Sequence, residues 1–239
     1  GDELFGGYNR YFHGASVWRR LSRLPQPVRA FAARAATALS PAALDRMVGA
    51  MGGLAPRELA GGRAGEKLHK LAGLLPATDQ AAFHRAMLSY WPDPERVVLG
   101  SQATAHADPL AGHDDLSFAE RAMLVDTLHY LPDDILAKVD RASMAVSLEA
   151  REPLLDHRLI EFAAGLPERL RIRGGQGKWL LKHAMERYLP REVLYRPKQG
   201  FVTPIAAWLR GPLASEARGI AHGATLSRTG WFDGDRVAA

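Results

Sequence analysis

The sequence predicts a mostly α-helical protein. Apolar residues recur at intervals of three and four over residues 16–92 and again beyond residue 117, and this spacing is the period of amphipathic helices. Prolines divide these stretches, as expected at helix boundaries. The sequence has no series of apolar strands alternating with the helices, and it has no internal repeat.

The first helical region covers residues 16–92. Its apolar positions are joined by alanine-rich filler, and it is divided by Pro25, Pro27, Pro41, Pro56 and Pro76. Residues 100–116 have no sustained period and are rich in small and polar side chains, so they predict a surface loop. Ser117, with Glu120 three residues later, is the pattern of a helix N-cap with a capping box.

A second helical region is predicted over about residues 117–150. We expect an interruption at Pro132, because proline lacks the amide donor that an interior helical position needs. Pro153 is expected to end the region, because proline disfavours helix at the residue before it.

Residues 157–189 also have a helical pattern, except for the run LRIRGG at 170–175. The alternation in that run, followed by two glycines, predicts a short strand or hairpin arm. After Pro190 the chain reads as irregular, and a last helix is predicted to begin near Pro204.

The composition is that of a folded, water-soluble protein. Hydrophobic residues make up 47% and charged residues 24% of 239 residues, which suffice for one large domain or two small ones. The chain has no cysteine, which excludes disulfides, thiolate metal sites and thiol nucleophiles and favours a cytoplasmic location. No apolar run approaches the roughly 20 residues of a membrane-spanning helix, so no membrane association is expected. The first residue is glycine rather than methionine, which indicates a piece of a longer protein.

The net charge of +5 raises the question of nucleic-acid binding. The 31 basic residues are dispersed among 26 acidic ones, and the densest basic stretch, residues 18–23, is short and mixed. This distribution favours a solvated basic face, and we expect no nucleic-acid partner.

Two acids, Asp2 and Glu3, stand immediately before a glycine pair and an aromatic residue in the string GDELFGGY. Adjacent carboxylates beside flexible backbone suit a magnesium ion that shares its oxygen ligands with substrate phosphates. The alternative is an exposed acidic helix start, which the helix dipole stabilises. The spacing by itself favours this alternative.

A charged helix face is predicted around residue 138. At 100° per residue Asp134, Lys138 and Arg141 lie together, opposite an apolar stripe formed by Ile135, Val139, Ala142 and Val146. One interpretation is a surface helix with an Asp-to-Lys pair four residues apart, and the other is a cationic face that lines a pocket for an anionic substrate. The pattern alone favours the surface helix.

Three segments in order, GDELFGGYNRY, LAKVDRASMAVSLEAREPLLD and YRPKQGF, resemble the synthetase half of the asparagine synthase family, which is of the PP-loop ATP pyrophosphatase type. The resemblance extends from residue 1 to about 212. It implies that the chain is the C-terminal helical portion of an α/β adenine-nucleotide α-hydrolase-like (PP-loop) synthetase domain. Its expected parts are the end of the nucleotide-site motif, a helical layer, a loop, a helical region with active-site segments, and a tail, over residues 1–15, 16–99, 100–116, 117–212 and 213–239.

The resemblance also implies site residues. Asp2 would bind the Mg²⁺ that bridges the phosphates of ATP, and Glu3 would be a neighbouring acid of the ATP site. Lys198, in RPK, matches the family lysine placed on the α-phosphate and acyl-adenylate. Lys138 takes the place of a family arginine that holds the substrate or intermediate, and Asp134 matches a nearby family aspartate if a gap of one residue is allowed.

Three further residues follow from family motifs. Glu149 and Arg151 stand in an E-x-R motif, where a structural ion pair and a substrate contact are both open. Lys178 begins KWLLK, which corresponds to the family's K-x-x-L-R. Departures from the family pattern include Glu152 for valine, Leu154 for phenylalanine, lysine for arginine at position 138, and the sequence QGFVTP after Lys198.

The activity that the resemblance implies is ATP-dependent conversion of aspartate to asparagine with glutamine-derived ammonia. An N-terminal glutaminase domain and a PP-loop, neither of which is among these 239 residues, would be its partners in the same polypeptide, and a homodimer is left open. One alternative is a related enzyme that forms amides on another carboxylate, such as a β-lactam synthetase, a lasso-peptide cyclase or a surface-glycan amidotransferase. Another is a noncatalytic helical interaction module.

Overall fold

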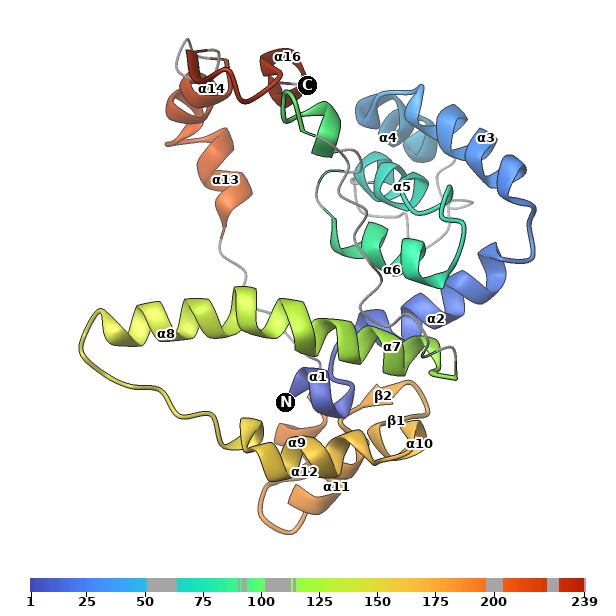
Figure 1. Cartoon of the computed structure of the whole chain (residues 1–239). Coiled ribbons are helices and arrows are strands. Elements are labelled where there is room, and N and C mark those ends of the chain that lie inside the picture. Colours follow the sequence, from blue (N-terminus) through green and yellow to red (C-terminus); the bar gives the residue numbers. More distant parts are fainter. Residues whose placement is uncertain are drawn as a thin grey trace. The chain divides into compact units, whose positions relative to one another are not determined.

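A computed structural model describes residues 1–50, 64–89, 91, 94–101, 113, 115–196, 204–222 and 228–238. The described part is mostly helical, which confirms the predicted fold class (Figure 1). The chain forms two compact units. The first joins Gly1–Leu88 to Asp108–Leu194, and the second joins Ser89–Ala107 to Tyr195–Ala239.

In its described residues, the first unit begins with the helices α1 (Asp2–Phe5), α2 (Asn9–Leu21), α3 (Gln26–Thr37), α4 (Pro41–Ala50), α5 (Ala64–Ala72) and α6 (Gln80–Leu88). As predicted, prolines mark helix boundaries at two of these starts, because Pro25 is the N-cap of α3 and Pro41 is the first residue of α4. Arg29 of α3 is buried, and its guanidinium donates hydrogen bonds to the carbonyl oxygens of Leu75 and Ala77. This side chain ties α3 to the turn that precedes α6.

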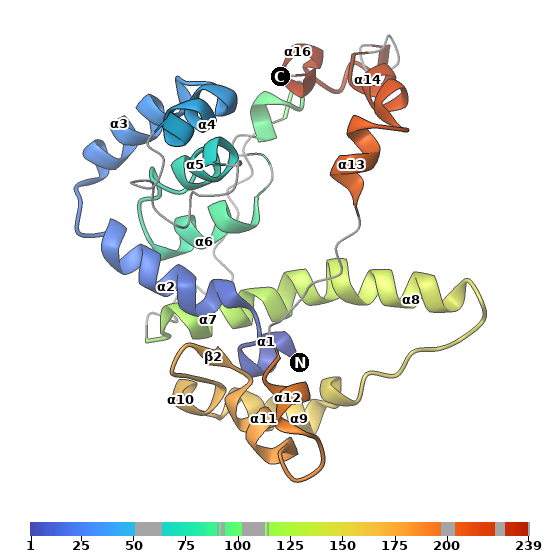
Figure 2. The ribbon, with the colours of Figure 1, turned by 180° about the vertical axis from the view of Figure 1, so that it is seen from behind.

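One long helical rod continues the unit, and it consists of α7 (Phe118–Val125), the π-helix η3 (Asp126–Leu136) and α8 (Ala137–Met144) (Figures 1 and 2). The capping box of Ser117 and Glu120 is present at its start, as predicted. The predicted interruption at Pro132 is wrong, because the rod runs through this residue as π-helix. In an α turn the proline ring would clash with the carbonyl group four residues earlier. The wider π turn places a different carbonyl group opposite the ring.

The rod ends at Met144, earlier than Pro153, so the predicted end is also wrong. Ser147 takes a left-handed conformation with a φ of 58°. The Leu148 amide donates to the Ser143 carbonyl oxygen at 3.0 Å, the six-to-one bond of a Schellman motif. Glycine is the usual residue at such a helix end, so a serine gives no sequence signal there. Pro153 instead begins the short 3₁₀ helix η4 (Pro153–Leu155).

The remaining elements of the unit are α9 (His157–Ala164), α10 (Glu168–Arg171), β1 (Ile172–Arg173), β2 (Gln176–Gly177), α11 (Trp179–Met185) and α12 (Arg191–Leu194). The two strands pair antiparallel through Gly174 and Gly175, whose φ values are 59° and 76°. Two positive φ values in a two-residue turn are typical of the type I′ hairpin. The predicted hairpin arm is confirmed, although its first two residues belong to α10.

Two apolar clusters stabilise the first unit. The larger lies where α2, α6 and α7 meet, and its buried members are Tyr11, Ala77, Phe83, Phe118, Ala119, Ala122 and Met123. The smaller joins Leu4 and Phe5 of α1 to Ala163 of α9, with Leu181 of α11 packed against them. Helix α1 is therefore anchored by its apolar residues.

The second unit contains the 3₁₀ helix η2 (Pro94–Arg96), α13 (Ile205–Arg210), α14 (Ala214–His222) and α16 (Gly234–Ala238). Val98 and Phe232 form an isolated antiparallel bridge. Helix α13 follows Pro204 as its N-cap, which confirms the helix predicted there. Among the described helices of both units, none combines the length and apolarity needed to cross a bilayer.

Candidate functional site

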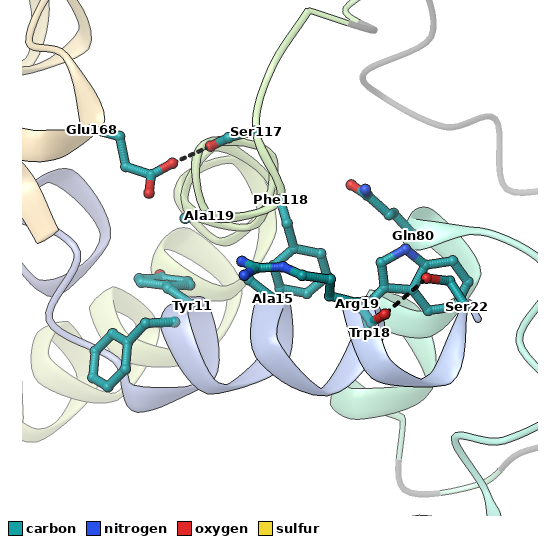
Figure 3. A pocket seen from close by; sticks show the side chains of 11 residues that line it. Tyr11, Ala15, Trp18, Arg19, Ser22, Gln80, Ser117, Phe118, Ala119 and Glu168 are labelled. Atoms are coloured by element: carbon teal, nitrogen blue, oxygen red, sulfur yellow. Dashed lines mark hydrogen bonds between the residues drawn. The ribbon is translucent and has the colours of Figure 1, made fainter. Parts of the chain in front are cut away.

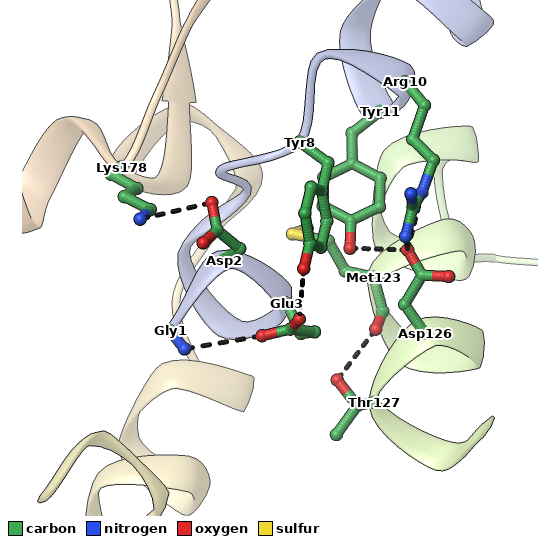
Figure 4. A network of polar contacts seen from close by, with 10 residues as sticks. All are labelled: Gly1, Asp2, Glu3, Tyr8, Arg10, Tyr11, Met123, Asp126, Thr127 and Lys178. Carbon is green, nitrogen blue, oxygen red and sulfur yellow. Dashed lines mark hydrogen bonds and ion pairs between the residues drawn. The ribbon is translucent and has the colours of Figure 1, made fainter. Parts of the chain in front are cut away.

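Helix α1 is a single turn that presents one acid outward and the other inward (Figure 4). The Asp2 side chain is 25% exposed, whereas Glu3 is only 3% exposed. Gly6 ends the helix in a left-handed conformation with a φ of 70°, and a Cβ there would lie 2.5 Å from Cγ1 of Ile172. The backbone angle favours glycine at this position, and the close approach of the hairpin leaves no room for a Cβ.

The end of the hairpin closes on α1 and brings Lys178 to Asp2. The Lys178 amide donates to the Phe5 carbonyl oxygen at 2.8 Å, and its Nζ lies 3.2 Å from Asp2 Oδ1. Glycines permit this approach, because a Cβ on Gly177 would overlap the Gly6 carbonyl oxygen and one on Gly7 would overlap the Asp2 carboxylate. The structure thus joins two predicted site residues that are far apart in the sequence.

Lys182 stands beside this pair, one turn further along α11. Partial burial lowers the pKa of Lys182, and the charge of Lys178 lowers it further. Asp2, Lys178 and Lys182 therefore combine a partly exposed carboxylate with two neighbouring ammonium groups. Compact ammonium groups bind phosphate oxygens, and a carboxylate can complete the coordination of a phosphate-bound magnesium ion. Sequence reasoning named Lys182 only as part of KWLLK.

Glu3 has a different environment from Asp2. Its Oε1 accepts a hydrogen bond of 2.9 Å from the Tyr8 hydroxyl, and burial together with this contact raises the pKa of Tyr8. Glu3 thus faces the interior and ties α1 to the start of α2 (Figure 4). Its expected role at the ATP site remains a prediction.

A buried carboxylate, Asp126, lies at the junction of α7 and η3 and is fully inaccessible to solvent. Its Oδ2 accepts three hydrogen bonds, from Arg10 Nε at 3.0 Å, Arg10 Nη2 at 2.7 Å and the Tyr11 hydroxyl at 2.7 Å. Sequence reasoning missed this cluster. A signal was present, because residues 118, 119, 122, 123 and 126 form the buried face of the helix, and an acid on such a face needs a polar partner.

The Arg10 guanidinium also stacks on aromatic rings. Its Cζ lies 4.2 Å from the centre of the Tyr8 ring and 4.9 Å from that of Tyr130 on η3. Burial raises the pKa of Tyr130, and the charge of Asp134 raises it further. Asp134 in turn pairs with Lys138 four residues later, as the sequence predicted. Contacts therefore run from Glu3 through Tyr8, Arg10 and Tyr130 to the predicted charged face.

Other predicted site residues lie apart from this group. Glu149 and Arg151 form an ion pair of 2.9 Å in the segment after α8, and their side chains are 67% and 83% exposed. That geometry matches the structural ion pair left open by the sequence. Lys198 lies outside the described residues, so its place at the site remains a prediction.

Within the described residues, no three histidine, aspartate or glutamate side chains gather as a metal site. Magnesium is commonly bound through one or two carboxylates together with substrate phosphates. The partly exposed Asp2 carboxylate fits that mode, since it can supply one ligand while a nucleotide supplies others.

A surface groove of about 450 Å³ follows one face of α2 (Figure 3). Its lining comprises Tyr11, Phe12, Ala15, Trp18, Arg19, Ser22, Gln80, Ser117, Phe118, Ala119 and Glu168. Glu168 accepts a hydrogen bond from the Ser117 hydroxyl, so its carboxylate is engaged at the start of α7. The groove contains neither Asp2 nor Lys178, and the acids of α1 remain the candidate site.

Comparison with known proteins yields one family. The asparagine synthase family matches this chain over residues 1–239. Putative glutamine-hydrolysing asparagine synthetases of Mycobacterium bovis and Mycobacterium tuberculosis are 32% identical over 209 residues, which is 87% of this chain and 29% of theirs. Glutamine-hydrolysing asparagine synthetase 1 of Bacillus subtilis is 28% identical over 230 residues, or 92% of this chain and 32% of its own.

A shorter match is more similar. The glutamine-hydrolysing asparagine synthetase of Gallus gallus is 43% identical over 77 residues, which is 31% of this chain and 14% of the chicken protein. No solved structure matches the chain. The chain spans only 29% to 32% of the length of the bacterial relatives.

Proposed function

Because the chain belongs to the asparagine synthase family, we propose that the complete polypeptide is an ATP-dependent ligase that converts aspartate to asparagine. The observation that carries this proposal is the contact between Asp2 and Lys178, whose Oδ1 and Nζ atoms lie 3.2 Å apart. The neighbouring glycine positions have no room for a Cβ. Two distant family motifs meet there to form a site suited to magnesium and phosphate.

The proposed reaction has two steps. In the first, an oxygen of the aspartate side-chain carboxylate attacks the α-phosphorus of ATP, and the bond to pyrophosphate breaks. In the second, ammonia attacks the acyl carbon of the adenylate, the bond to AMP breaks, and the nitrogen loses a proton. Negative charge shifts among phosphate oxygens in the first step, so fixed positive charge nearby stabilises its transition state.

The residues of the chain have separate tasks in this scheme. Asp2 holds magnesium, which when bound supplies neutralisation of the phosphate charge. Lys178, which lies beside Asp2, and its neighbour Lys182 would bind phosphate oxygens. Lys198 acts on the α-phosphate, and Lys138 with Asp134 contacts the aspartate or its adenylate. Each of these roles is a proposal that rests on the family motifs.

The ammonia source and the remaining nucleotide contacts come from outside this chain. The relatives are named as glutamine-hydrolysing enzymes, and this chain spans about a third of their length. We therefore assign glutamine hydrolysis and the PP-loop to other parts of the same polypeptide. The absence of cysteine among the 239 residues supports a cytoplasmic setting.

Product analysis of the complete protein tests the proposal. With ATP, Mg²⁺, aspartate and glutamine we expect asparagine, AMP and pyrophosphate in equal amounts, and no AMP when aspartate is omitted. Lys178→Met should lower kcat by about a hundredfold, the scale for one positioned charge. Lys70→Met, at an exposed lysine of α5 in the same unit, is the matched control and should leave kcat unchanged. ADP as the product, or no ATP consumption, would refute the proposal.

One observation favours a second candidate, amide formation on a carboxylate other than that of aspartate. Lys138 stands where the family has arginine, and its side chain is 70% exposed. Lysine lacks the bidentate fork with which arginine recognises a carboxylate. A panel of carboxylic acids in the same assay separates the two candidates, because AMP would then form with another acid and not with aspartate.

A further inference from the structure

Arg10 links the segment that follows α1 to the long rod. Its guanidinium binds the Asp126 carboxylate through two nitrogens and covers the ring of Tyr8 at 4.2 Å. Tyr8 then reaches Glu3 through its hydroxyl, and Glu3 directly follows Asp2 on α1 (Figure 4). A single side chain thus contacts both the rod and the segment that immediately follows α1.

The anchor on the rod side is a buried charge. Asp126 is fully inaccessible, and in the described part of the chain its Oδ1 has no hydrogen-bond partner. All hydrogen bonds to this carboxylate in that part come from Arg10 and Tyr11. A buried carboxylate is costly unless it is paired, so its hold on Arg10 is strong and directional.

Helix α1 needs such an external anchor. A helix of four residues has too few internal hydrogen bonds to be stable by itself. Its apolar side is fixed by Leu4 and Phe5, and its two acids have contacts of their own on the polar side. The bond from Tyr8 to Glu3 supplies one of them, and Arg10 holds Tyr8 in place.

We propose that Arg10, held by Asp126, is a positioning residue that orients α1 so that the Asp2 carboxylate faces the magnesium site. The metal-binding part of this inference rests on the proposed function of Asp2. Arg10 does not touch the substrate in this scheme. It acts through Tyr8 and Glu3, as outer residues act on metal ligands elsewhere.

Two conservative variants of the complete protein test the inference. Arg10→Lys keeps the charge but loses the two-nitrogen contact and the flat surface over Tyr8. Tyr8→Phe keeps the ring under Arg10 but removes the hydroxyl that binds Glu3. Glu120→Gln is the matched control, because it disrupts another partly buried ion pair of the same rod, with Arg171 at 2.9 Å. In the described part of the chain, neither partner of this pair forms a hydrogen bond or ion pair with α1.

The first measurement is amide hydrogen exchange and does not depend on activity. The Phe5 and Gly7 amides bond to the carbonyl oxygens of Gly1 and Asp2 at 3.1 and 2.7 Å, so their protection reports the α1 turn. We expect both amides to exchange about tenfold faster or more in Arg10→Lys and Tyr8→Phe, and at the wild-type rate in Glu120→Gln. Equal exchange in wild type and Arg10→Lys would overturn the inference.

The second measurement is the Mg²⁺ concentration that gives half-maximal pyrophosphate release. It should rise about 10- to 100-fold in Arg10→Lys, the scale seen for residues that orient metal ligands, while kcat at saturating Mg²⁺ falls much less. If Arg10 had only a structural role, Glu120→Gln and Arg10→Lys would both lower stability. Neither variant would then raise the Mg²⁺ requirement by more than it lowers kcat. An unchanged Mg²⁺ requirement in an active Arg10→Lys enzyme would overturn the metal-binding part.

The two failures are distinguishable. If the wild-type enzyme releases no pyrophosphate, the proposed function fails, and the claim that Asp2 is held for magnesium fails with it. Hydrogen exchange alone then decides whether Arg10 orients α1. If wild type is active and the Arg10→Lys enzyme matches it in both measurements, the inference fails and the proposed function stands.

Discussion

Substitution of Gly177 by alanine should separate the hairpin from α1. A Cβ at this position would overlap the Gly6 carbonyl oxygen and would lie 2.9 Å from its carbon. Carbon atoms pack at roughly 3.5–4.0 Å, so the two backbones must move apart by about 1 Å. The obstacle is backbone on both sides, and no side-chain rotation relieves it. The 2.8 Å bond from the Lys178 amide to Phe5 would then exceed hydrogen-bonding distance.

The cost follows from these two effects. Overpacking costs about 1–3 kcal/mol, and a lost backbone hydrogen bond about 0.5–1.5 kcal/mol. The Lys178–Asp2 ion pair is partly exposed, so its loss adds little. We therefore expect the junction to be destabilised by about 2–4 kcal/mol, which corresponds to exchange of the Lys178 amide about 30-fold faster or more.

Amide exchange at Lys178 in the complete protein measures this effect locally. Gly165→Ala is the matched control, since a Cβ there would lie at an ordinary 3.6 Å from the Phe162 carbonyl oxygen, its nearest neighbour outside the adjacent residues, and φ is −75°. That variant should be neutral or more stable by up to about 1 kcal/mol, because alanine restricts the unfolded chain. If Lys178 exchanged at the same rate in both variants, the argument from close approach would be wrong.

Three further predictions concern the nucleotide site. Asp2→Asn in the complete protein should abolish ATP-dependent turnover and leave the far-ultraviolet circular dichroism unchanged, whereas full activity at limiting Mg²⁺ would exclude Asp2 as a ligand. Lys198→Ala and Lys198→Arg should each lower kcat about a hundredfold or more, since arginine lacks the compact ammonium, and near wild-type rates in either would make Lys198 a solvated loop residue. The 239-residue chain alone should show no tight Mg²⁺-ATP binding by calorimetry, and micromolar affinity would place the nucleotide site within it.

The parts of the fold that local sequence determines were predictable. The capping box at Ser117, the proline at the start of α4 and the glycine turn of the hairpin each depend on residues within a few positions of one another. The π-helix at Pro132 and the helix end at Ser147 were not, because proline usually breaks a helix and serine rarely takes a positive φ. In both cases, the surrounding structure outweighs the local preference of one residue.

The candidate site was likewise predictable from the sequence only in part. The motif GDELFGGY indicates the two acids and the glycines, but it does not say which acid faces outward. That distinction comes from long-range partners, because Lys178 lies beside Asp2 while Tyr8 holds Glu3 in the interior. The alternative of an exposed acidic helix start therefore holds for only one of the two carboxylates.

Arg10 and Asp126 illustrate why the rest was hidden. An arginine two residues after an aromatic, and an acid on an apolar helix face, are each common in sequences and carry no pairing information. They are 116 residues apart, and only the packing of α2 against α7 brings them within 2.7 Å. Since a one-turn helix cannot fix its own orientation, the chemistry of the α1 acids depends on partners that the local motif does not contain.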